Sequence, residues 1–295
     1  MGKIDLHVHS SHSSDGELSP ETIINRCAAQ DVDTVSITDH NTVSGISEGK
    51  AAAARHGIQF IVGSEINCQT QNGTVLHMLA YDFDPAVPFF QKIEGWVNER
   101  EETANLERIE LLEDLGIKLD KDRIREVKGE RVLTCEMLAE VALGIAENST
   151  HPLMKPFFPG GERSDQAHVN FFWDMCTTGK PADIPVTYLP VKEVVEEIQQ
   201  AGGVAVLAHP GISIGLDLDL FDEIVAAGII GVEVFSSYHS PEEVAFFMEQ
   251  CRRYDLGVTA GSDFHGILKP LIELGSQSTP ENEALIRDFL AKRIS

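Results

Sequence analysis

Three histidines and an aspartate lie close together near the start of the chain, in the stretch DLHVHSSHSSDG: His7, His9, His12 and Asp15. His7 and His9 are two residues apart in a run that predicts a strand, so both side chains face the same side of it. Imidazole nitrogens bind zinc, manganese and iron, and a carboxylate can bridge two cations. The stretch therefore indicates a metal site, although one such histidine pair is a weak signal.

Imidazoles and carboxylates also lie at or near the ends of other predicted strands: Asp39, His40, Glu65, His77, His209, Asp263 and His265. Each has an ordinary alternative role, such as a helix cap for Asp39 or a turn residue for His209. The carboxyl ends of parallel strands in a barrel meet at one mouth, where such side chains converge. So many candidate ligands predict two or three divalent ions. Nitrogen and oxygen donors suit manganese, zinc and iron alike, so the identity of the metal stays open.

Short apolar segments that predict strands alternate with helical patterns in two parts of the sequence. The strands are expected at 3–8, 33–40, 58–67, 74–83, 203–209, 256–262 and between 228 and 240. This alternation predicts a parallel α/β sheet. Between the two parts, the patterns at 87–116 and 136–148 predict helices, and a loop-rich piece follows. We therefore expect a barrel domain of residues 1–83 and 181–295, with a helical cap subdomain of residues 84–180 inserted into it.

Two local signals fix the expected ends of helices in the first part. Ser19 followed by Pro20 is typical of a helix start, and Gly57 is typical of a helix end. Neither position carries chemistry, so both serve only to place the elements that hold the candidate ligands.

Composition limits the classes of function. The chain has 295 residues, 42% of them hydrophobic, and a formal net charge of −24. Such an acidic surface disfavours binding along nucleic acid but leaves a phosphorylated substrate open, because bound cations reverse the local sign. Five separated cysteines without a CxxC pair disfavour a disulfide framework and a thiolate zinc site. With no signal-peptide pattern and no long apolar run, we expect a cytoplasmic protein without a membrane partner.

The motifs DLHVHSSHSSDG, ITDHNTVSG, GSEIN, LAHPG and GSDFHG together resemble the PHP (polymerase and histidinol phosphatase) family, which is related to the amidohydrolases. The resemblance spans about residues 3–83 and 180–275. It implies a distorted (β/α)7 TIM-like barrel with a trinuclear metal centre. By motif, the first ion takes His7, His9, Glu65 and Asp263; the second takes Glu65, His77 and His209; and the third takes Asp15, His40 and His265. His12 competes with Asp15, and Asp5 and Asp39 orient ligand histidines.

The resemblance implies a metal-dependent phosphoesterase in which a metal-bound hydroxide attacks phosphorus. Asp263, His265 and Glu65 are its expected catalytic residues, and proton transfer is assigned to Asp263 or His265. Expected phosphate-binding residues are Arg131, Arg163, Lys180 and His239. Family relatives often follow the arginine at the position of Arg131 with Pro-His, whereas this chain has Val132 and Leu133.

The expected substrate is a phosphate mono- or diester of a small nucleotide or ribose phosphate, and long nucleic acid is not expected. A histidinol-phosphate-type phosphatase is an alternative with the same chemistry. A metal-dependent amide or lactone hydrolase is an alternative from another class, but that branch often bridges its metals with a carboxylated lysine, where this chain has Glu65. A non-catalytic module is a third possibility. The sequence fixes neither the oligomeric state nor the metal.

Overall fold

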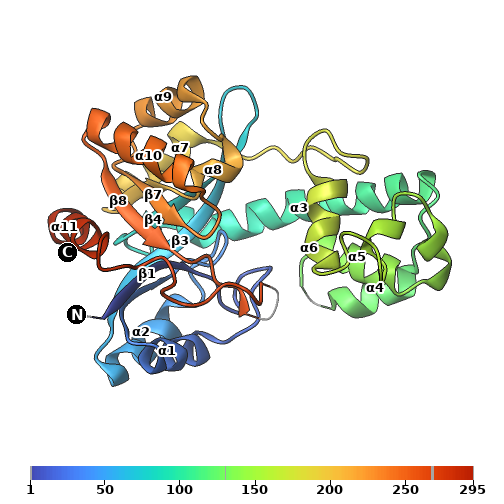
Figure 1. Cartoon of the computed structure of the whole chain (residues 1–295), viewed down its shortest axis with the longest axis horizontal. Coiled ribbons are helices and arrows are strands. Elements are labelled where there is room, and N and C mark those ends of the chain that lie inside the picture. Colours follow the sequence, from blue (N-terminus) through green and yellow to red (C-terminus); the bar gives the residue numbers. More distant parts are fainter. Residues whose placement is uncertain (1, 130, 267–268, 295) are drawn as a thin grey trace. The chain divides into compact units, whose positions relative to one another are not determined.

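The computed structural model describes residues 2–129, 131–266 and 269–294, and the chain divides into two compact units. Unit 1 comprises Met1–Glu94 and Tyr188–Ser295, and unit 2 comprises Gly95–Thr187. In Figure 1, the strands of unit 1 lie among its helices, and unit 2 is formed by helices and loops. Each unit has its own apolar core.

Seven strands of unit 1 form a nearly closed barrel in the order β1-β2-β3-β4-β6-β7-β8. Their bounds are β1 Lys3–Val8, β2 Val32–Ile37, β3 Gln59–Gln69, β4 Val75–Tyr81, β6 Val204–Leu207, β7 Gly231–Ser236 and β8 Gly257–Gly261. A short strand, β5 (Leu189–Pro190), pairs with β3. The first and last strands meet where Asp263 N donates to His7 O at 2.9 Å and His9 N donates to Phe264 O at 2.9 Å. The predicted barrel class is confirmed.

The direction of β4 differs from the parallel arrangement that the sequence predicted. β4 runs antiparallel to both of its neighbours, β3 and β6. Only residues 70–74 separate β3 from β4, and this connection is too short for the crossover that a parallel pair requires. As a result, the start of β4 lies at the same edge as the carboxyl ends of the other strands, and this places His77 opposite Asn67 of β3.

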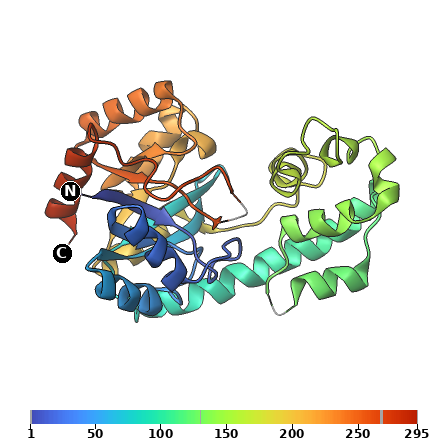
Figure 2. The same ribbon diagram turned by 60° about the horizontal axis from the view of Figure 1, so that its bottom comes forward.

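Helices surround the strands of unit 1, as two views of the molecule show (Figures 1 and 2). They are α1 Pro20–Ala29, α2 Ile46–His56, α7 Val191–Gln200, α8 Pro210–Ser213, α9 Leu218–Ala226, α10 Pro241–Tyr254 and α11 Glu283–Arg293. Both predicted helix signals are confirmed: Ser19 Oγ accepts from Thr22 N at 3.2 Å, and Gly57 closes α2 with a φ of 68°. α11 packs so closely on β8 that a Cβ on Gly257 would lie 2.0 Å from the Phe289 ring.

Unit 2 contains most of the long helix α3 (Pro88–Asp114), which the sequence predicted, and six shorter helical segments among its described residues, 95–129 and 131–187. They are α4 Lys121–Lys128, α5 Cys135–Leu143, η1 Ala146–Thr150, η2 Lys155–Phe157, α6 Ala167–Phe171 and η3 Phe172–Cys176. The helix expected at 136–148 is shorter, because α5 is capped at Gly144 and η1 follows. None of the helices in the described ranges combines the length and apolar character that a membrane span needs.

Candidate metal centre

Histidines and carboxylates from six strands or their ends meet at one mouth of the barrel in unit 1. They are His7, His9, Asp15, His40, Glu65, His77, His209, Asp263 and His265, the nine predicted ligands. His7 belongs to β1, Glu65 to the middle of β3 and His77 to the start of β4, while most of the others follow the carboxyl ends of strands. The strands are rigid, so they fix the distances between these side chains.

The carboxylate of Glu65 lies at the centre of the group. Its Oε2 atom lies 3.1 Å from Nε2 of both His7 and His9, and 3.3 Å from His40 Nδ1. Its Oε1 atom lies 3.0 Å from His77 Nδ1 and 3.0 Å from His209 Nε2. Glu65 is 1% exposed, so this single carboxylate connects five imidazoles away from bulk water.

Asp263 approaches the same histidine pair from β8. Its Oδ1 atom lies 3.3 Å from His7 Nε2 and 3.0 Å from His9 Nε2. Its Oδ2 atom points to a different pair, accepting from the hydroxyl of Tyr238 and, at 2.7 Å, from Lys269 Nζ. The two oxygens of one carboxylate therefore face two different sets of neighbours.

A second cluster forms beside the first one. Asp15 Oδ2 lies 2.9 Å from His265 Nε2 and 3.5 Å from His40 Nε2, and His9 belongs to the same group. His12, the alternative to Asp15, points away from this cluster: it is 36% exposed, and its Nε2 atom lies 4.0 Å from Glu48. The structure thus brings Asp15, rather than His12, to the cluster.

Three groups of potential donor atoms each lie within 4.8 Å of one another. They are His7, His9, Glu65 and Asp263; His9, Asp15, His40 and His265; and His40, Glu65 and His77. In the first group, His7 Nδ1 donates to Glu233 Oε1 at 3.0 Å, so the Nε2 atom of a neutral His7 carries a lone pair. That lone pair faces His9 Nε2 at 3.1 Å and the acceptor oxygens of Glu65 and Asp263. Such a set of converging acceptors fits a cation.

Electrostatics also require positive charge here. Burial opposes charge on His7 and His9, yet the neighbouring carboxylates raise the pKa of both, that of His9 to about 10. Burial would raise the pKa of Glu65, but the nearby imidazoles hold it well below its ordinary value. Protons supply the positive charge in this balance, and metal ions can replace them because metal binding releases protons. Glu65 Oε2 has three imidazole nitrogens nearby but no well-aligned hydrogen bond among the described residues, and His209 Nδ1 has none either.

Part of the backbone strain lies at the cluster. Six non-glycine residues among those described have positive φ angles, and three of them, Asn41 at 57°, His209 at 22° and Asp263 at 57°, belong to the barrel mouth. His209 and Asp263 each lie two residues after the end of a strand. Such conformations cost roughly 1–3 kcal/mol each and persist where the surrounding structure enforces them, often at functional sites.

Three residues of the site were missed from the sequence: Glu233, Tyr238 and Lys269. Glu233 is fully buried; its Oε1 atom contacts His7 Nδ1 and its Oε2 atom accepts from His209 N at 2.9 Å. Its position as an acidic residue between Val232 and Val234 in an apolar strand was a usable signal. Tyr238 precedes the predicted His239, and Lys269 lies three residues after the motif GSDFHG, but neither residue belongs to a motif.

Asp5 and Asp39, expected to orient ligand histidines, bond mainly to the backbone. Asp5 accepts from Ser262 N at 2.9 Å and from Gly275 N at 2.7 Å, and Asp39 accepts from Ser10 N at 2.6 Å. Burial raises the pKa of Asp5 to about 6, against the effect of these hydrogen bonds. The two aspartates therefore hold the segments that carry the ligands, while Glu233 contacts an imidazole ring.

The predicted phosphate-binding residues have other partners. Both nitrogens of His239 are used: Nδ1 donates to Val234 O at 2.8 Å and Nε2 accepts from Gly211 N at 2.9 Å. The other three belong to unit 2. Arg131 donates to Val127 O at 2.8 Å, Arg163 pairs with Asp174 at 2.7 Å, and Lys180 lies exposed in a loop.

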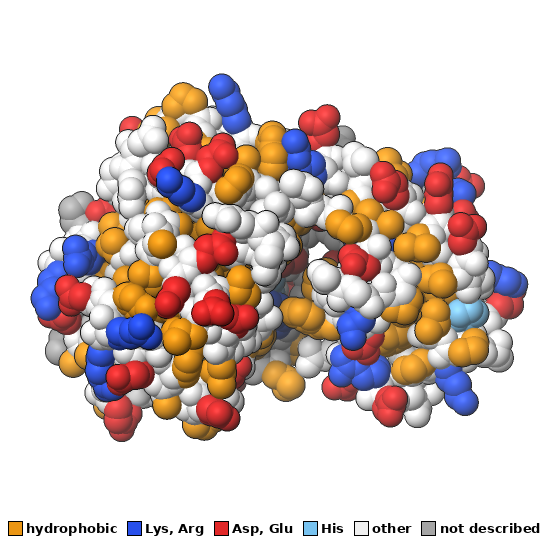
Figure 3. Space-filling model, turned by 90° about the horizontal axis from the view of Figure 1, so that it is seen from above, with side chains coloured by type: hydrophobic (Ala, Val, Ile, Leu, Met, Phe, Trp, Pro, Cys, Tyr) orange, Lys and Arg blue, Asp and Glu red, His pale blue; other side chains and the backbone are white. Residues whose placement is uncertain are grey.

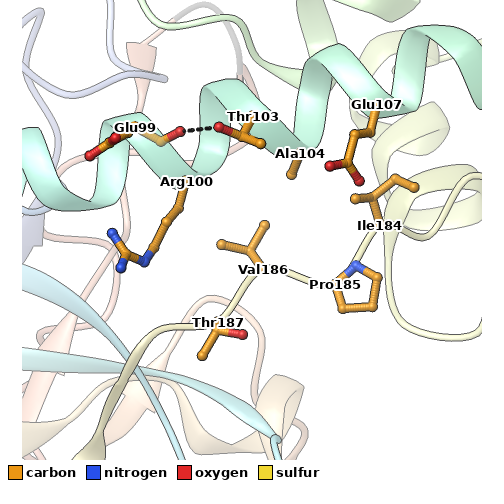
Figure 4. A pocket seen from close by; sticks show the side chains of 9 residues that line it. All are labelled: Glu99, Arg100, Thr103, Ala104, Glu107, Ile184, Pro185, Val186 and Thr187. Atoms are coloured by element: carbon orange, nitrogen blue, oxygen red, sulfur yellow. Dashed lines mark hydrogen bonds between the residues drawn. The ribbon is translucent and has the colours of Figure 1, made fainter.

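A separate hollow of about 410 Å³ lies in unit 2, between α3 and the extended segment 184–187 (Figure 4). It is lined by Glu99, Arg100, Thr103, Ala104, Glu107, Ile184, Pro185, Val186 and Thr187. The Arg100 guanidinium lies 3.4 Å from the centre of the Trp96 ring and donates to Trp96 O at 3.0 Å. None of the predicted site residues lines this hollow, so the candidate site remains the barrel mouth.

Comparison with known proteins agrees with this geometry. The PHP domain model matches residues 5–133. A 3′,5′-nucleoside bisphosphate phosphatase from Chromobacterium violaceum is 33% identical over 90% of this chain and 88% of its own. A phosphoribosyl 1,2-cyclic phosphate 1,2-diphosphodiesterase from Eggerthella lenta is 28% identical over 89% of this chain and 94% of its own. A 5′-3′ exoribonuclease from Haemophilus influenzae is 28% identical over 89% of this chain and 90% of its own.

A solved structure supports the fold. A protein from Bifidobacterium adolescentis superposes with a TM-score of 0.78 at 24% identity, covering 99% of this chain and 96% of the other. The barrel, the histidine and carboxylate clusters at its mouth and the identity to the phosphatase over most of both chains lead to one conclusion: the chain belongs to the PHP domain family.

Proposed function

We propose that this chain is a metal-dependent phosphoesterase that hydrolyses a phosphate ester of a small nucleotide or ribose phosphate. The observation that carries the proposal is the position of Glu65, a buried carboxylate that lies within 3.3 Å of five imidazoles. Such a carboxylate is suited to bridging two cations. The family membership supports phosphoester hydrolysis as the reaction.

We assign the ligands to three ions, as the resemblance implied. His7, His9, Glu65 and Asp263 would hold the first, Glu65, His77 and His209 the second, and Asp15, His40 and His265 the third. Bound divalent cations supply Lewis acidity, which activates water as a nucleophile and neutralises charge on phosphoryl oxygens. Nitrogen and oxygen donors suit manganese, zinc or iron.

The residues of the chain fix the orientation of these donors. The contact of His7 Nδ1 with Glu233 turns the His7 Nε2 lone pair toward the cluster. His265 Nδ1 donates to Asp263 O at 2.8 Å, so its Nε2 atom faces Asp15. We assign proton transfer during the reaction to Asp263 or His265, because both lie at this mouth. Glu65 holds the two sides of the site together.

Small phosphorylated substrates are favoured by charge. The chain carries a formal net charge of −24, and the face seen in Figure 3 has acidic and basic side chains interspersed, without a basic stripe among the residues described there. Long nucleic acid binds to clustered Lys and Arg. Arg131, Lys180 and His239 remain our predicted substrate contacts. A cytoplasmic location also remains a prediction, supported by five cysteines that are free thiols.

The 5′ end of RNA is a second candidate substrate. It is favoured by one specific observation, the similarity over 89% of this chain to a protein named as a 5′-3′ exoribonuclease. A short 5′ end presents the same phosphate ester chemistry to the site as a mononucleotide does.

Hydrolysis of a substrate panel, followed by phosphate release and by phosphorus NMR of the products, tests the proposal. Protein loaded in turn with manganese, zinc and iron would be offered a nucleoside 3′,5′-bisphosphate, a cyclic ribose phosphate, histidinol phosphate, a short RNA with a 5′ phosphate and an aryl amide. We expect phosphate ester hydrolysis of one of the first two at the highest kcat/KM, seen as phosphate release from the bisphosphate or as ring opening to a monoester from the cyclic phosphate. Amide turnover without phosphate ester hydrolysis, or no turnover with metal bound, would contradict it.

Two histidine variants provide the matched control. His9→Ala removes an imidazole that is fully buried in the cluster, while His56→Ala removes an exposed imidazole at the end of α2. We expect the first to abolish phosphate release and the second to retain it. Equal loss in both variants would place the activity outside the cluster.

A further inference from the structure

Lys269 is the one lysine or arginine among the described residues whose ion pair reaches the carboxylates of the candidate metal centre. Its Nζ atom lies 2.7 Å from Asp263 Oδ2 and donates to the Tyr238 hydroxyl at 2.6 Å. The side chain is 24% exposed, so it reaches from solvent into the site. Neither Lys269 nor Tyr238 was among the residues expected from the sequence.

The position of Tyr238 is fixed by three neighbours. Its hydroxyl donates to Asp263 Oδ2 and accepts from Lys269. Its ring meets the His209 ring edge-on, with centres 5.8 Å apart. Tyr238 therefore lies next to both His209 and Asp263, which belong to different sides of the Glu65 cluster, and it presents the lysine beside them.

The charges at the barrel mouth indicate a role for Lys269 in substrate binding. The mouth of the barrel collects the carboxylates of Glu65, Asp263, Asp15 and Glu233. A phosphate ester is also an anion, so a fixed cation next to Asp263 reduces the repulsion that it meets. An ammonium group has three N–H donors and serves as a point-charge binder of phosphate. Two of the three N–H donors of Lys269 Nζ have acceptors among the described residues, and the third is the one that a phosphoryl oxygen would use.

We propose that Lys269, held in place by Tyr238, binds the phosphoryl group of the substrate at the edge of the metal centre. Lys269 contributes a charge-assisted hydrogen bond to a phosphoryl oxygen, and Tyr238 positions the ammonium group. This inference rests on the proposed phosphoesterase function. It adds a substrate-binding residue from unit 1 itself, on the loop that follows β8.

Calorimetric binding of inorganic phosphate to the metal-loaded full chain tests this inference without requiring turnover. We expect Lys269→Met to weaken phosphate binding at least about tenfold, Lys269→Arg to restore part of it, and Tyr238→Phe to cause a smaller loss. A single charge-assisted hydrogen bond of about 1.5–3 kcal/mol corresponds to an effect of this size. Lys192→Met, which removes an exposed charge on α7, is the matched control and should bind phosphate normally.

Metal content and kinetics separate the possible outcomes. Lys269→Met should keep its metal and raise KM for an ester substrate more than it lowers kcat. Unchanged phosphate affinity in this variant, or absence of phosphate binding in the wild type, would overturn the inference. Loss of metal in Lys269→Met without recovery in Lys269→Arg would also overturn it, because the lysine would then only support Asp263. Phosphate binding that depends on Lys269 without turnover of any ester would instead defeat the proposed function alone.

Discussion

Both units bury polar side chains, but those side chains find different partners. In unit 2, the buried Arg108 donates from Nε to Ala182 O at 2.9 Å and from Nη2 to Ile184 O at 3.3 Å. Asn148 similarly donates to the carbonyls of Lys118 and Ala142, each at 2.8 Å. These partners are main-chain carbonyls, and Arg108 also donates to the side chain of Asn105.

At the barrel mouth in unit 1, the buried polar side chains of the cluster face one another. His7, His9, Glu65 and Asp263 are all at most 4% exposed, and their nitrogen and oxygen atoms converge within 3.3 Å. A side chain whose donor bonds to a main-chain carbonyl, as Arg108 does with Ala182 and Ile184, does not connect to further side chains through that bond. Here the acceptors converge on shared points instead.

The difference separates structural from functional burial of polar groups. A buried donor that matches a backbone carbonyl contributes to stability. A group of buried acceptors that share one centre lowers the stability of the fold unless protons or cations compensate their charge. Such groups are therefore typical of functional sites. Removal of a polar side chain should therefore change metal binding in unit 1 and stability in unit 2.

The largest expected effect comes from Glu65→Gln. The variant keeps the size of the side chain but removes the charge that five imidazoles share. We expect metal content to fall to a minor fraction and kcat/KM to fall at least about 10³-fold, or roughly 4 kcal/mol of transition-state stabilisation. Elemental analysis and phosphate release measure the two quantities.

Glu249→Gln is the matched control, because Glu249 is an exposed residue of α10 that pairs with Arg252. It should retain both metal and activity. Full metal content and activity in Glu65→Gln would show that the buried carboxylate of unit 1 does not bind metal. The buried polar groups of the two units would then not differ in function.

A smaller effect is expected from Glu233, which contacts a ligand ring rather than the cluster centre. Glu233→Ala removes the acceptor of His7 Nδ1 and of His209 N. Loss of such an orienting carboxylate typically lowers metal affinity about 10–100-fold. Competition with a chelating dye would measure this affinity, and Glu233→Gln, which keeps the side-chain volume, should lose less. Wild-type affinity in both variants would show that the ring needs no orienting partner.

The sequence predicted the barrel and the residue types at its mouth because both depend on local patterns. Alternation within an apolar run tells which strand residues share a face, and this placed His7 on the inner side of β1. The direction of β4 was missed, because alternation is the same for parallel and antiparallel strands. The short connection at 70–74 held the missing information.

Other features depend on contacts that no local pattern records. α4 has two apolar residues, Ile124 and Val127, one turn apart, and this is too short a pattern to predict a helix. Lys269 donates to Asp263 six residues earlier in the chain, and no local pattern records this contact. Glu233 lies between these cases: an acidic residue in an apolar strand is visible in the sequence, but its partner His7 is 226 residues away.

Arg108→Met should lower stability in unit 2 without changing the metal site. The carbonyls of Ala182 and Ile184 would lose their donor, at a cost of about 1–3 kcal/mol in the free energy of unfolding. Both tryptophans, Trp96 and Trp173, lie in unit 2, so tryptophan fluorescence in urea follows this unit. Arg125→Met, which changes an exposed arginine of α4, is the control. Loss of metal in Arg108→Met would show that the two interiors are coupled.

The smallest expected effect concerns an exposed helix cap in unit 1, away from either interior. Ser240 Oγ accepts from Glu243 N at 3.3 Å, and Glu243 Oε2 accepts from Ser240 N at 2.7 Å. Ser240→Ala should cost about 1 kcal/mol, seen as faster hydrogen exchange in α10 with metal content unchanged. The bonds from Ser240 lower the pKa of Glu243, so the carboxylate stabilises the fold above its ordinary pKa, and this contribution is lost as pH falls through the lower folded value. The difference between variant and wild type should therefore shrink in acid. A difference in stability that grows in acid, or a loss of metal at neutral pH, would mean that α10 supports the barrel mouth. The contrast between the polar groups of unit 1 and unit 2 would then extend beyond the buried side chains.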